Sequence, residues 1–235
     1  MRSTKIVATL GPASSEPEQI RNLLDAGTDV FRLNFSHGTR EAHRTLIRRI
    51  RAAADAAGRE VGIMQDLGGP KIRTGPMEDG SIVLTPGAEV TITTEPVTGT
   101  AERFSTQYAG LPADVQPGAS ILLDDGALEL AVLDVQEGRV RCRVARGGEL
   151  CSRKGINLPD TPVSAPTIGA KDEADLAVGI EEGVDFVAVS FVREAADIRH
   201  VRAVLEAGNC PAQVIAKIER PEAVENIEAI TQAAH

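Results

Sequence analysis

Residues 29–35 read DVFRLNF, and residues 61–67 read VGIMQDL. Both runs are short and mainly apolar, and the segment between them, 39–57, repeats alanine, leucine and isoleucine at helical spacing before Gly58 ends it. A third apolar run, KIVATL, occupies residues 5–10. Buried strands that alternate with helices are typical of a parallel sheet covered by helices, so this part of the chain predicts three β/α units.

Residues 70–166 follow a different pattern, without a sustained helical period. Short alternating segments fill this stretch, and ALELAVLDVQEGRVRCRV predicts a hairpin that turns near Gly138. Alternation of strand and helix then returns, with strands expected at 184–191 (VDFVAVSF) and 213–218 (QVIAKI). Asp172 is expected to cap the helix before the first of these strands. We therefore predict a small all-β domain inserted between two stretches of β/α units.

The flanking segments, 1–69 and 167–235, hold about 140 residues. A complete (β/α)8 barrel uses roughly 31 residues for each unit, so this length fits the five expected strands and not eight. We predict an α/β fold in which 1–69 and 167–235 form a partial (β/α)8 TIM barrel that stops before its sixth strand. The β-barrel-like domain at 70–166 is inserted after the third strand.

Composition limits the classes of partner. The chain has 235 residues, of which 42% are hydrophobic and 25% charged, and its formal net charge is −9. A negative charge of this size repels a phosphate backbone, which argues against nucleic acid as a general partner. No apolar run approaches the roughly 20 residues that span a bilayer, the N-terminus lacks a signal-peptide core, and the cysteines form no CxxC pair. We expect a cytoplasmic protein that acts on small molecules and binds no membrane.

Polar side chains interrupt the predicted strands near their C-terminal ends. Both faces of a buried parallel strand are normally apolar, so these interruptions mark candidate functional residues. Because the C-terminal ends of parallel strands meet at one edge of a sheet, we expect the candidates at one rim. They are Arg32, Asn34 and Ser36 from the second strand and its exit, Asp66 from the third strand, and Lys217 and Glu219 from the fifth strand and its exit.

These residue types suit phosphoryl transfer. A carboxylate such as Glu219 can bind Mg²⁺ together with substrate oxygens, while Arg32 and Lys217 would neutralise a phosphoryl group that moves between two oxygens. Arg73 could hold a nucleotide phosphate, since the chain contains neither a Walker-type loop nor a G-x-G-x-x-G motif. A structural explanation stays open beside this one, because Lys217 and Glu219 could form a strand-end salt bridge of little energetic weight.

The segment after the second strand also has two explanations. Asn34 and Ser36 could be turn caps that precede the helix at Thr39. His37 could be a solvated loop residue, because it has no second histidine at metal-ligand spacing. Convergence on one rim favours a functional site over these explanations.

Seven strings occur in order along the chain: TKIVATLGPAS, FRLNFSHG, DLGGPKIR, LLDDG, KGINLP, DFVAVSFVR and IAKIE. Together they resemble the pyruvate kinase family from end to end. The resemblance implies a split (β/α)8 barrel, a B domain that closes over the site as a lid, and phosphoryl transfer from phosphoenolpyruvate to ADP, which gives pyruvate and ATP in glycolysis. It also implies a homo-oligomer, usually a tetramer, at full length.

The resemblance implies roles for the candidate residues. Lys217 resembles the catalytic lysine that stabilises the transferring phosphoryl group, and Arg32 resembles the arginine that contacts the phosphate of phosphoenolpyruvate. Glu219 resembles one of two carboxylates on the essential Mg²⁺ (or Mn²⁺). The implied nucleotide contacts are Arg73, Lys154 and His37, and the implied monovalent-cation ligands are Asn34, Ser36 and Asp66.

One departure from the family concerns potassium. Potassium-dependent members usually carry a segment like D-T-K-G-P-E after the third strand, whereas residues 66–71 read DLGGPK. Leu67 offers no side-chain oxygen to a cation, and Lys71 places an ammonium where the family often has a carboxylate. A fixed ammonium can replace the charge of a bound potassium ion, so we predict that K⁺ is dispensable.

A second departure concerns magnesium. The family's other Mg²⁺-binding aspartate is expected in a strand directly after His235. The residues up to His235 would therefore supply only one of the two protein carboxylates that bind Mg²⁺, that of Glu219. We therefore expect the 235 residues alone to be inactive. Two alternatives remain: a truncated non-catalytic homologue that binds nucleotide or a full-length partner, and another barrel enzyme of phosphoenolpyruvate or pyruvate, such as a metal-dependent aldolase. The inserted domain argues against the aldolase.

Overall fold

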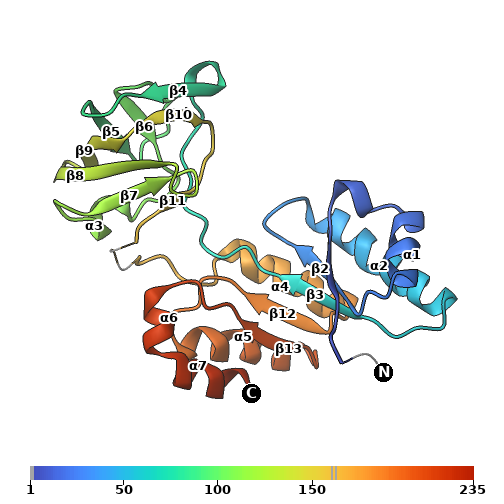
Figure 1. The fold of residues 1–235 in the computed structure, drawn as a ribbon. Coiled ribbons are helices and arrows are strands. Elements are labelled where there is room, and N and C mark those ends of the chain that lie inside the picture. The colour runs from blue at the N-terminus through green and yellow to red at the C-terminus, as the bar shows by residue number, and fades with distance from the viewer. Residues whose placement is uncertain (1–2, 160, 162) are drawn as a thin grey trace. The chain divides into compact units, whose positions relative to one another are not determined.

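The computed structural model describes residues 3–159, 161 and 163–235. The chain divides into two compact units. The first unit combines Met1–Pro70 with Pro166–His235, and the second unit is Lys71–Ala165. Figure 1 shows the first unit as strands with helices beside them, and the second unit as mostly strands.

The first unit contains a five-stranded parallel sheet, as predicted from the alternation of strands and helices. The strands follow one another across the sheet in the order β1-β2-β3-β12-β13, which is the neighbour-to-neighbour order of a (β/α) barrel. Their bounds are β1 Val7–Leu10, β2 Val30–Asn34, β3 Gly62–Asp66, β12 Phe186–Val189 and β13 Gln213–Ala216. The predicted α/β partial barrel is therefore confirmed.

Helices connect these strands and pack on the sheet (Figure 1). They are α1 Pro17–Asp25, α2 Arg40–Ala56, α4 Ala170–Glu182, α5 Ala195–Ala207, α6 Pro221–Glu225 and α7 Ile227–Ala234, with a 3₁₀ turn at Pro12–Ser14. Alternation along β2 separates two faces, because Phe31 and Leu33 are buried while Arg32 and Asn34 are half-buried. Phe31 and Leu33 belong to a core shared with Ile47 of α2, so the polar side chains of β2 are left on the other face.

The start of α4 differs from the sequence-based expectation. The residue before its first turn is Gly169, and Asp172 is the third residue of the helix and not its N-cap. The Asp172 carboxylate nevertheless accepts a hydrogen bond from the Gly169 amide at 3.2 Å, so it satisfies a free N–H from inside the first turn. Gly183 ends the helix in the left-handed conformation, with φ of +71°.

The second unit is built from a six-stranded sheet in the order β11-β7-β8-β9-β5-β6 and a two-stranded pair of β10 and β4. The strands are β4 Ser81–Leu84, β5 Glu89–Thr93, β6 Arg103–Ser105, β7 Ser120–Leu123, β8 Leu128–Gln136, β9 Arg139–Arg146, β10 Gly148–Cys151 and β11 Ile156–Asn157. Every pairing is antiparallel except the parallel pair of β5 and β6. The unit also contains a short helix, α3 Leu111–Asp114, and a 3₁₀ turn at Glu78–Gly80, so it is mainly β and not purely β.

The predicted hairpin joins β8 to β9. Its two loop residues, Glu137 and Gly138, have φ of +49° and +74°. Positive φ at both positions is the signature of the two-residue turn whose twist matches the strands it joins. The hairpin prediction is therefore confirmed.

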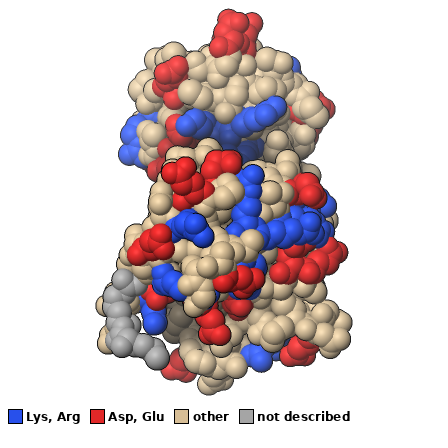
Figure 2. Space-filling model, turned by 90° about the vertical axis from the view of Figure 1, so that its right-hand side faces the viewer, with Lys and Arg blue, Asp and Glu red and all other residues tan. Residues whose placement is uncertain are grey.

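Charged side chains of both signs are mixed over the face drawn in Figure 2. Among the described residues, no helix combines the length and apolar character needed to cross a membrane.

Candidate functional site

The polar face of β2 meets the end of β3 through strand register. Asn34 pairs with Asp66 in the sheet, and Arg32 pairs with Thr9 of β1 on its other side. This register explains two side-chain contacts. Arg32 donates to Thr9 Oγ1 at 2.9 Å, and it also reaches the Asp66 carboxylate of β3, opposite Asn34.

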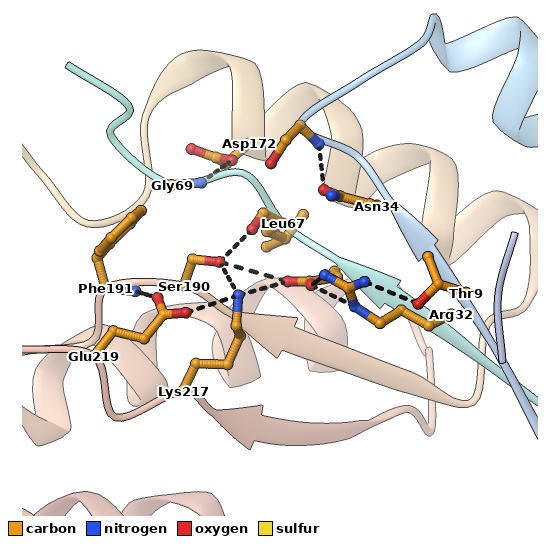
Figure 3. Close-up of polar contacts among 12 residues, drawn as sticks. Thr9, Arg32, Asn34, Leu67, Gly69, Asp172, Ser190, Phe191, Lys217 and Glu219 are labelled. Carbon is orange, nitrogen blue, oxygen red and sulfur yellow. Dashed lines mark hydrogen bonds and ion pairs between the residues drawn. The ribbon is translucent and has the colours of Figure 1, made fainter. Parts of the chain in front are cut away.

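The Asp66 carboxylate joins the two cations of the site, Arg32 and Lys217, which Figure 3 shows pointing toward one another. Its Oδ2 accepts a hydrogen bond from Arg32 Nε at 2.7 Å and a second, short one from the same guanidinium. Its Oδ1 accepts from Lys217 Nζ at 3.2 Å. The Asp66 side chain is 3% exposed, while those of Arg32 and Lys217 are 31% and 28% exposed. A buried carboxylate is therefore compensated by two cations that still face solvent in part.

Lys217 is held by two further groups. Its ammonium donates to Ser190 Oγ at 2.7 Å and lies 3.2 Å from Glu219 Oε1. Register again explains the contact with Ser190. Val189 of β12 pairs with Ala216 of β13, and Ser190 and Lys217 are the first residues after these two strands. The predicted convergence of Arg32, Asp66, Lys217 and Glu219 on one rim is thus present in the structure.

Glu219 is held by the backbone amide of Phe191, a residue with an unusual φ angle. Its Oε2 accepts from the Phe191 amide at 3.0 Å. Phe191 has φ of +56°, a left-handed conformation that is uncommon for a bulky residue, and the Arg220 guanidinium lies 5.8 Å from the centre of its ring. Strained positions of this kind concentrate at functional sites, which supports a functional role for this strand exit.

Ser190 and Phe191 are site residues that the sequence analysis missed. The signal for Ser190 was present, because it is a polar residue at the C-terminal end of the apolar run 184–191. The same rule identified Asp66 at the end of 61–67. Phe191 carried no comparable signal, because its contribution comes from its backbone amide and φ angle.

Asn34, Ser36 and His37 form a turn beside this cluster. Asn34 Oδ1 accepts from the Ser36 amide at 3.0 Å, and the His37 amide donates to the Asn34 carbonyl at 3.2 Å. The His37 side chain is exposed. These contacts agree with the turn-cap explanation, and they leave the ligand roles of the three residues as predictions.

His43 of α2 packs against this turn. His43 Nε2 is 2.8 Å from the His37 carbonyl, and its ring stacks on Phe35 with the ring centres 3.9 Å apart. Because burial disfavours the charged imidazolium, the pKa of His43 lies below its usual value. The neutral ring donates from Nε2, which leaves Nδ1 buried and without a hydrogen-bond partner in the part of the chain that the structure describes.

The predicted nucleotide contacts Arg73 and Lys154 lie near one another within the second unit. Arg73 pairs with Gly155 in an isolated bridge and donates to the Arg153 carbonyl at 3.0 Å. Lys154 forms an ion pair with Asp124 at 2.9 Å, and the hydrogen bond that the ammonium donates to this carboxylate raises the pKa of Lys154. Lys154 thus contacts the turn that contains Asp124, and Arg73 contacts the residues on either side of Lys154, Arg153 and Gly155.

The carboxylates of the first unit allow a test of the expected metal. Within residues 3–159, 161 and 163–235, no group of three or more histidine, cysteine, aspartate or glutamate side chains is placed to hold an ion. Asp66 is already engaged by two cations, whereas Glu219 is about one-third exposed. Mg²⁺ binds proteins through one or two carboxylates together with substrate oxygens, so Glu219 fits a ligand that requires further oxygens from the substrate.

Comparisons with known proteins are consistent with this arrangement. Residues 1–235 match the family model described as pyruvate kinase, barrel domain. The chain is 46% identical over 235 residues to a pyruvate kinase of Staphylococcus haemolyticus, and 47% identical over 236 residues to one of Geobacillus stearothermophilus. A solved pyruvate kinase from Cryptosporidium parvum superposes with a TM-score of 0.92 at 37% identity, covering 99% of this chain and 49% of that one. Each of the two curated relatives is matched over 99% of this chain but only 40% of its own length.

Proposed function

The chain belongs to the pyruvate kinase family, and from this membership we propose that the protein transfers the phosphoryl group of phosphoenolpyruvate to ADP. The observation that supports the proposal is the convergence of the Arg32 and Lys217 cations on one buried carboxylate, Asp66. Two partly exposed cations at one point of a rim suit a ligand with several anionic oxygens.

The proposed reaction breaks the bond between phosphorus and the enol oxygen and forms one to a terminal phosphate oxygen of ADP. The enolate that leaves takes up a proton at carbon and becomes pyruvate, so the products are pyruvate and ATP. In such transfers the protein contributes mainly position and charge compensation. We assign Lys217 to the transferring phosphoryl group and Arg32 to the phosphate of the bound substrate.

Glu219 would hold Mg²⁺ (or Mn²⁺), whose positive charge stabilises the phosphoryl oxygens when the ion is bound. The Phe191 amide fixes one carboxylate oxygen of Glu219, and Lys217 lies 3.2 Å from the other. Glu219 is thereby oriented by the protein before any ligand arrives. This pre-orientation reduces the entropy that must be lost when a ligand binds.

We propose the second unit as the lid of the family, with Arg73 and Lys154 as contacts to nucleotide phosphate and His37 as a further nucleotide contact. Support comes from the location of Arg73 and Lys154 together within that unit. In this proposal the ligands are phosphoenolpyruvate, ADP, ATP and pyruvate, and the natural assembly is a homo-oligomer.

We further propose that K⁺ is dispensable. The potassium ligands implied for the family are Asn34, Ser36 and Asp66, and two of them are already engaged. Asn34 Oδ1 accepts from the Ser36 amide, and the Asp66 carboxylate is compensated by Arg32 and Lys217. The Lys71 ammonium is the proposed substitute for the charge of the ion.

A Lys217→Met variant tests the function in the protein at its natural length. We expect turnover of phosphoenolpyruvate and ADP by the wild type, and a loss of about 10³-fold or more in kcat for the variant, because an ammonium that compensates developing charge is removed. Lys5→Met, a change of the same type at an exposed lysine, is the matched control and should keep wild-type kcat. Equal activity of the Lys217→Met protein would contradict the assignment.

The chain spans about 40% of the length of its curated relatives, and we propose a second candidate function beside the first. It is a non-catalytic homologue that binds nucleotide or a full-length partner. Absence of turnover at natural length, combined with calorimetrically measured ADP binding, would favour this candidate.

A further inference from the structure

Asp172 is a buried carboxylate that links two segments far apart in the sequence. Its Oδ2 accepts from the Gly169 amide at 3.2 Å, and its Oδ1 accepts from the Gly69 amide, 103 residues away, at 3.0 Å. The residue is only 3% exposed. Capping of α4 needs only the contact with Gly169. The contact with Gly69 therefore has a different role.

Gly69 belongs to a segment that needs an anchor. Gly68 and Gly69 are consecutive, and glycines lose more conformational entropy on ordering than other residues. Gly69 has φ of +64°, and a Cβ at this position would lie 2.8 Å from the Phe191 ring and 3.2 Å from Ser190 Cβ. The segment therefore passes closely over the exit of β12 in a conformation that glycine allows, and the Asp172 carboxylate fixes it there.

A directional chain of hydrogen bonds continues from this segment to Lys217 (Figure 3). The Ser190 hydroxyl donates to the Leu67 carbonyl at 2.7 Å, two residues before Gly69. A hydroxyl has one proton, so the same oxygen must use a lone pair to accept from Lys217 Nζ, which is 2.7 Å away. The position of the Leu67 carbonyl thus sets the direction in which Ser190 holds the ammonium.

We propose that Asp172 is a positioning residue for Lys217, acting through Gly69, Leu67 and Ser190. The role of Lys217 in this inference rests on the proposed function, while the structural link does not. Without the acceptor at Gly69, the glycine segment gains freedom and the Leu67 carbonyl shifts. The ammonium then loses the alignment that Ser190 gives it, although Asp66 and Glu219 still contact it. Misplacement by about 1 Å of a group that acts on the reacting atoms can reduce a rate by as much as 10²-fold.

Asp197 provides a matched control. It is the third residue of α5, as Asp172 is of α4, and it also accepts two backbone amides, from Arg193 at 2.9 Å and Glu194 at 3.2 Å. Both of those amides lie in the residues that directly precede α5. An Asp197→Ala change therefore removes a helix cap of the same kind without touching the segment at Gly69.

The first arm of the test is kinetic and uses the protein at its natural length. We expect Asp172→Ala to lower kcat by about tenfold or more with a change in KM for phosphoenolpyruvate below about threefold, because orientation is lost more than binding. Asp197→Ala should also lower the unfolding midpoint, and it should leave kcat within about twofold. Asp172→Asn, which keeps one acceptor oxygen, should fall between the wild type and Asp172→Ala, and it replaces that variant if Asp172→Ala fails to fold.

The second arm does not depend on activity. Amide hydrogen exchange at Gly69 should accelerate in the Asp172 variants and stay slow in Asp197→Ala, and the NMR signal of the Lys217 ammonium should shift only in the Asp172 variants. An unmoved Lys217 signal, or an equal loss of kcat in Asp197→Ala, would overturn the proposal and leave Asp172 as a helix cap. An inactive wild type with the expected exchange pattern would instead reject the proposed function and retain the link.

Discussion

Two arginine–aspartate pairs in this molecule share their geometry and differ in their surroundings. At the rim of the first unit, Arg32 Nε donates to Asp66 at 2.7 Å, and on the outer face of the second unit Arg141 Nε donates to Asp134 at 2.9 Å. In both pairs a second guanidinium nitrogen contacts the same carboxylate oxygen. Asp66 is 3% exposed, whereas Asp134 is 26% exposed beside an arginine that is 50% exposed.

The difference shows that contact distance alone does not determine how much an ion pair stabilises the folded protein. A surface carboxylate that loses its partner is solvated by water, so such pairs contribute about 0–1 kcal/mol. A buried carboxylate has no such replacement, and removing one member of a buried pair costs about 3–5 kcal/mol. Asp66 also engages Lys217, so one buried group sets the positions of two cations that the proposed chemistry uses.

The largest effect is expected for Asp66→Ala. The change leaves Arg32 and Lys217 to repel one another without the carboxylate between them. Because both cations are partly exposed and can recover water, we expect a loss of about 3 kcal/mol in the free energy of unfolding, at the lower end of the range for buried pairs. Chemical denaturation followed by circular dichroism measures it.

Asp134→Ala is the matched control, since it removes the corresponding carboxylate from the exposed pair. We expect it to cost less than about 1 kcal/mol. Equal losses in the two variants would show that burial does not separate the pairs.

Most of this site could be predicted from the sequence, for an identifiable reason. Parallel strands place their C-terminal ends together, so Arg32, Asp66, Lys217 and Glu219 could be assigned to one rim from polar interruptions of apolar runs. The strand alternation likewise gave the five-stranded sheet. These inferences need only the period of each element and the direction of the strands.

The connections among these residues could not be predicted. That Arg32 pairs with Asp66 depends on the register of Asn34 against Asp66, which no local pattern specifies. The contact between Asp172 and Gly69 joins residues 103 positions apart, so the sequence suggested only a helix cap for Asp172. Long-range register and backbone φ angles are properties of the packed chain.

The histidines extend the comparison to a titrating group. His43 is 7% exposed, and its pKa is lowered by burial, whereas His200 is exposed beside Glu173 at 3.5 Å. Below about pH 6.5 the unfolded chain binds a proton at His43 that the folded chain resists, so stability falls as the pH falls through this range. The groups that face His43 include Asp175, Lys171 and the His37 carbonyl, and their effects on its pKa are smaller than that of burial.

We therefore expect His43→Gln to lose less stability than the wild type between pH 7.5 and pH 5.5, even if it is less stable at the upper limit. Thermal unfolding midpoints across this range measure the difference. A wild-type slope in the His43 variant would show that acid destabilisation has another source.

The smallest effect is expected for Arg141→Ala. Arg141 contacts Asp134 and Glu89, and Arg143 contacts Glu89 as well, so the exposed pair is part of a small network along the second unit. Each member is solvated and can re-pair after a deletion, so we expect a loss in the free energy of unfolding well below that of Asp66→Ala. Salt should reduce this loss further, because the Debye length falls to about 3 Å at 1 M. Denaturation at low and high salt measures it. Arg32→Ala removes the arginine whose carboxylate partner, Asp66, is buried, and its cost should change less with salt. A loss as large as that of Asp66→Ala that persists in high salt would mean that the network is structurally essential, and exposure would then be a poor guide to how much an ion pair stabilises this protein.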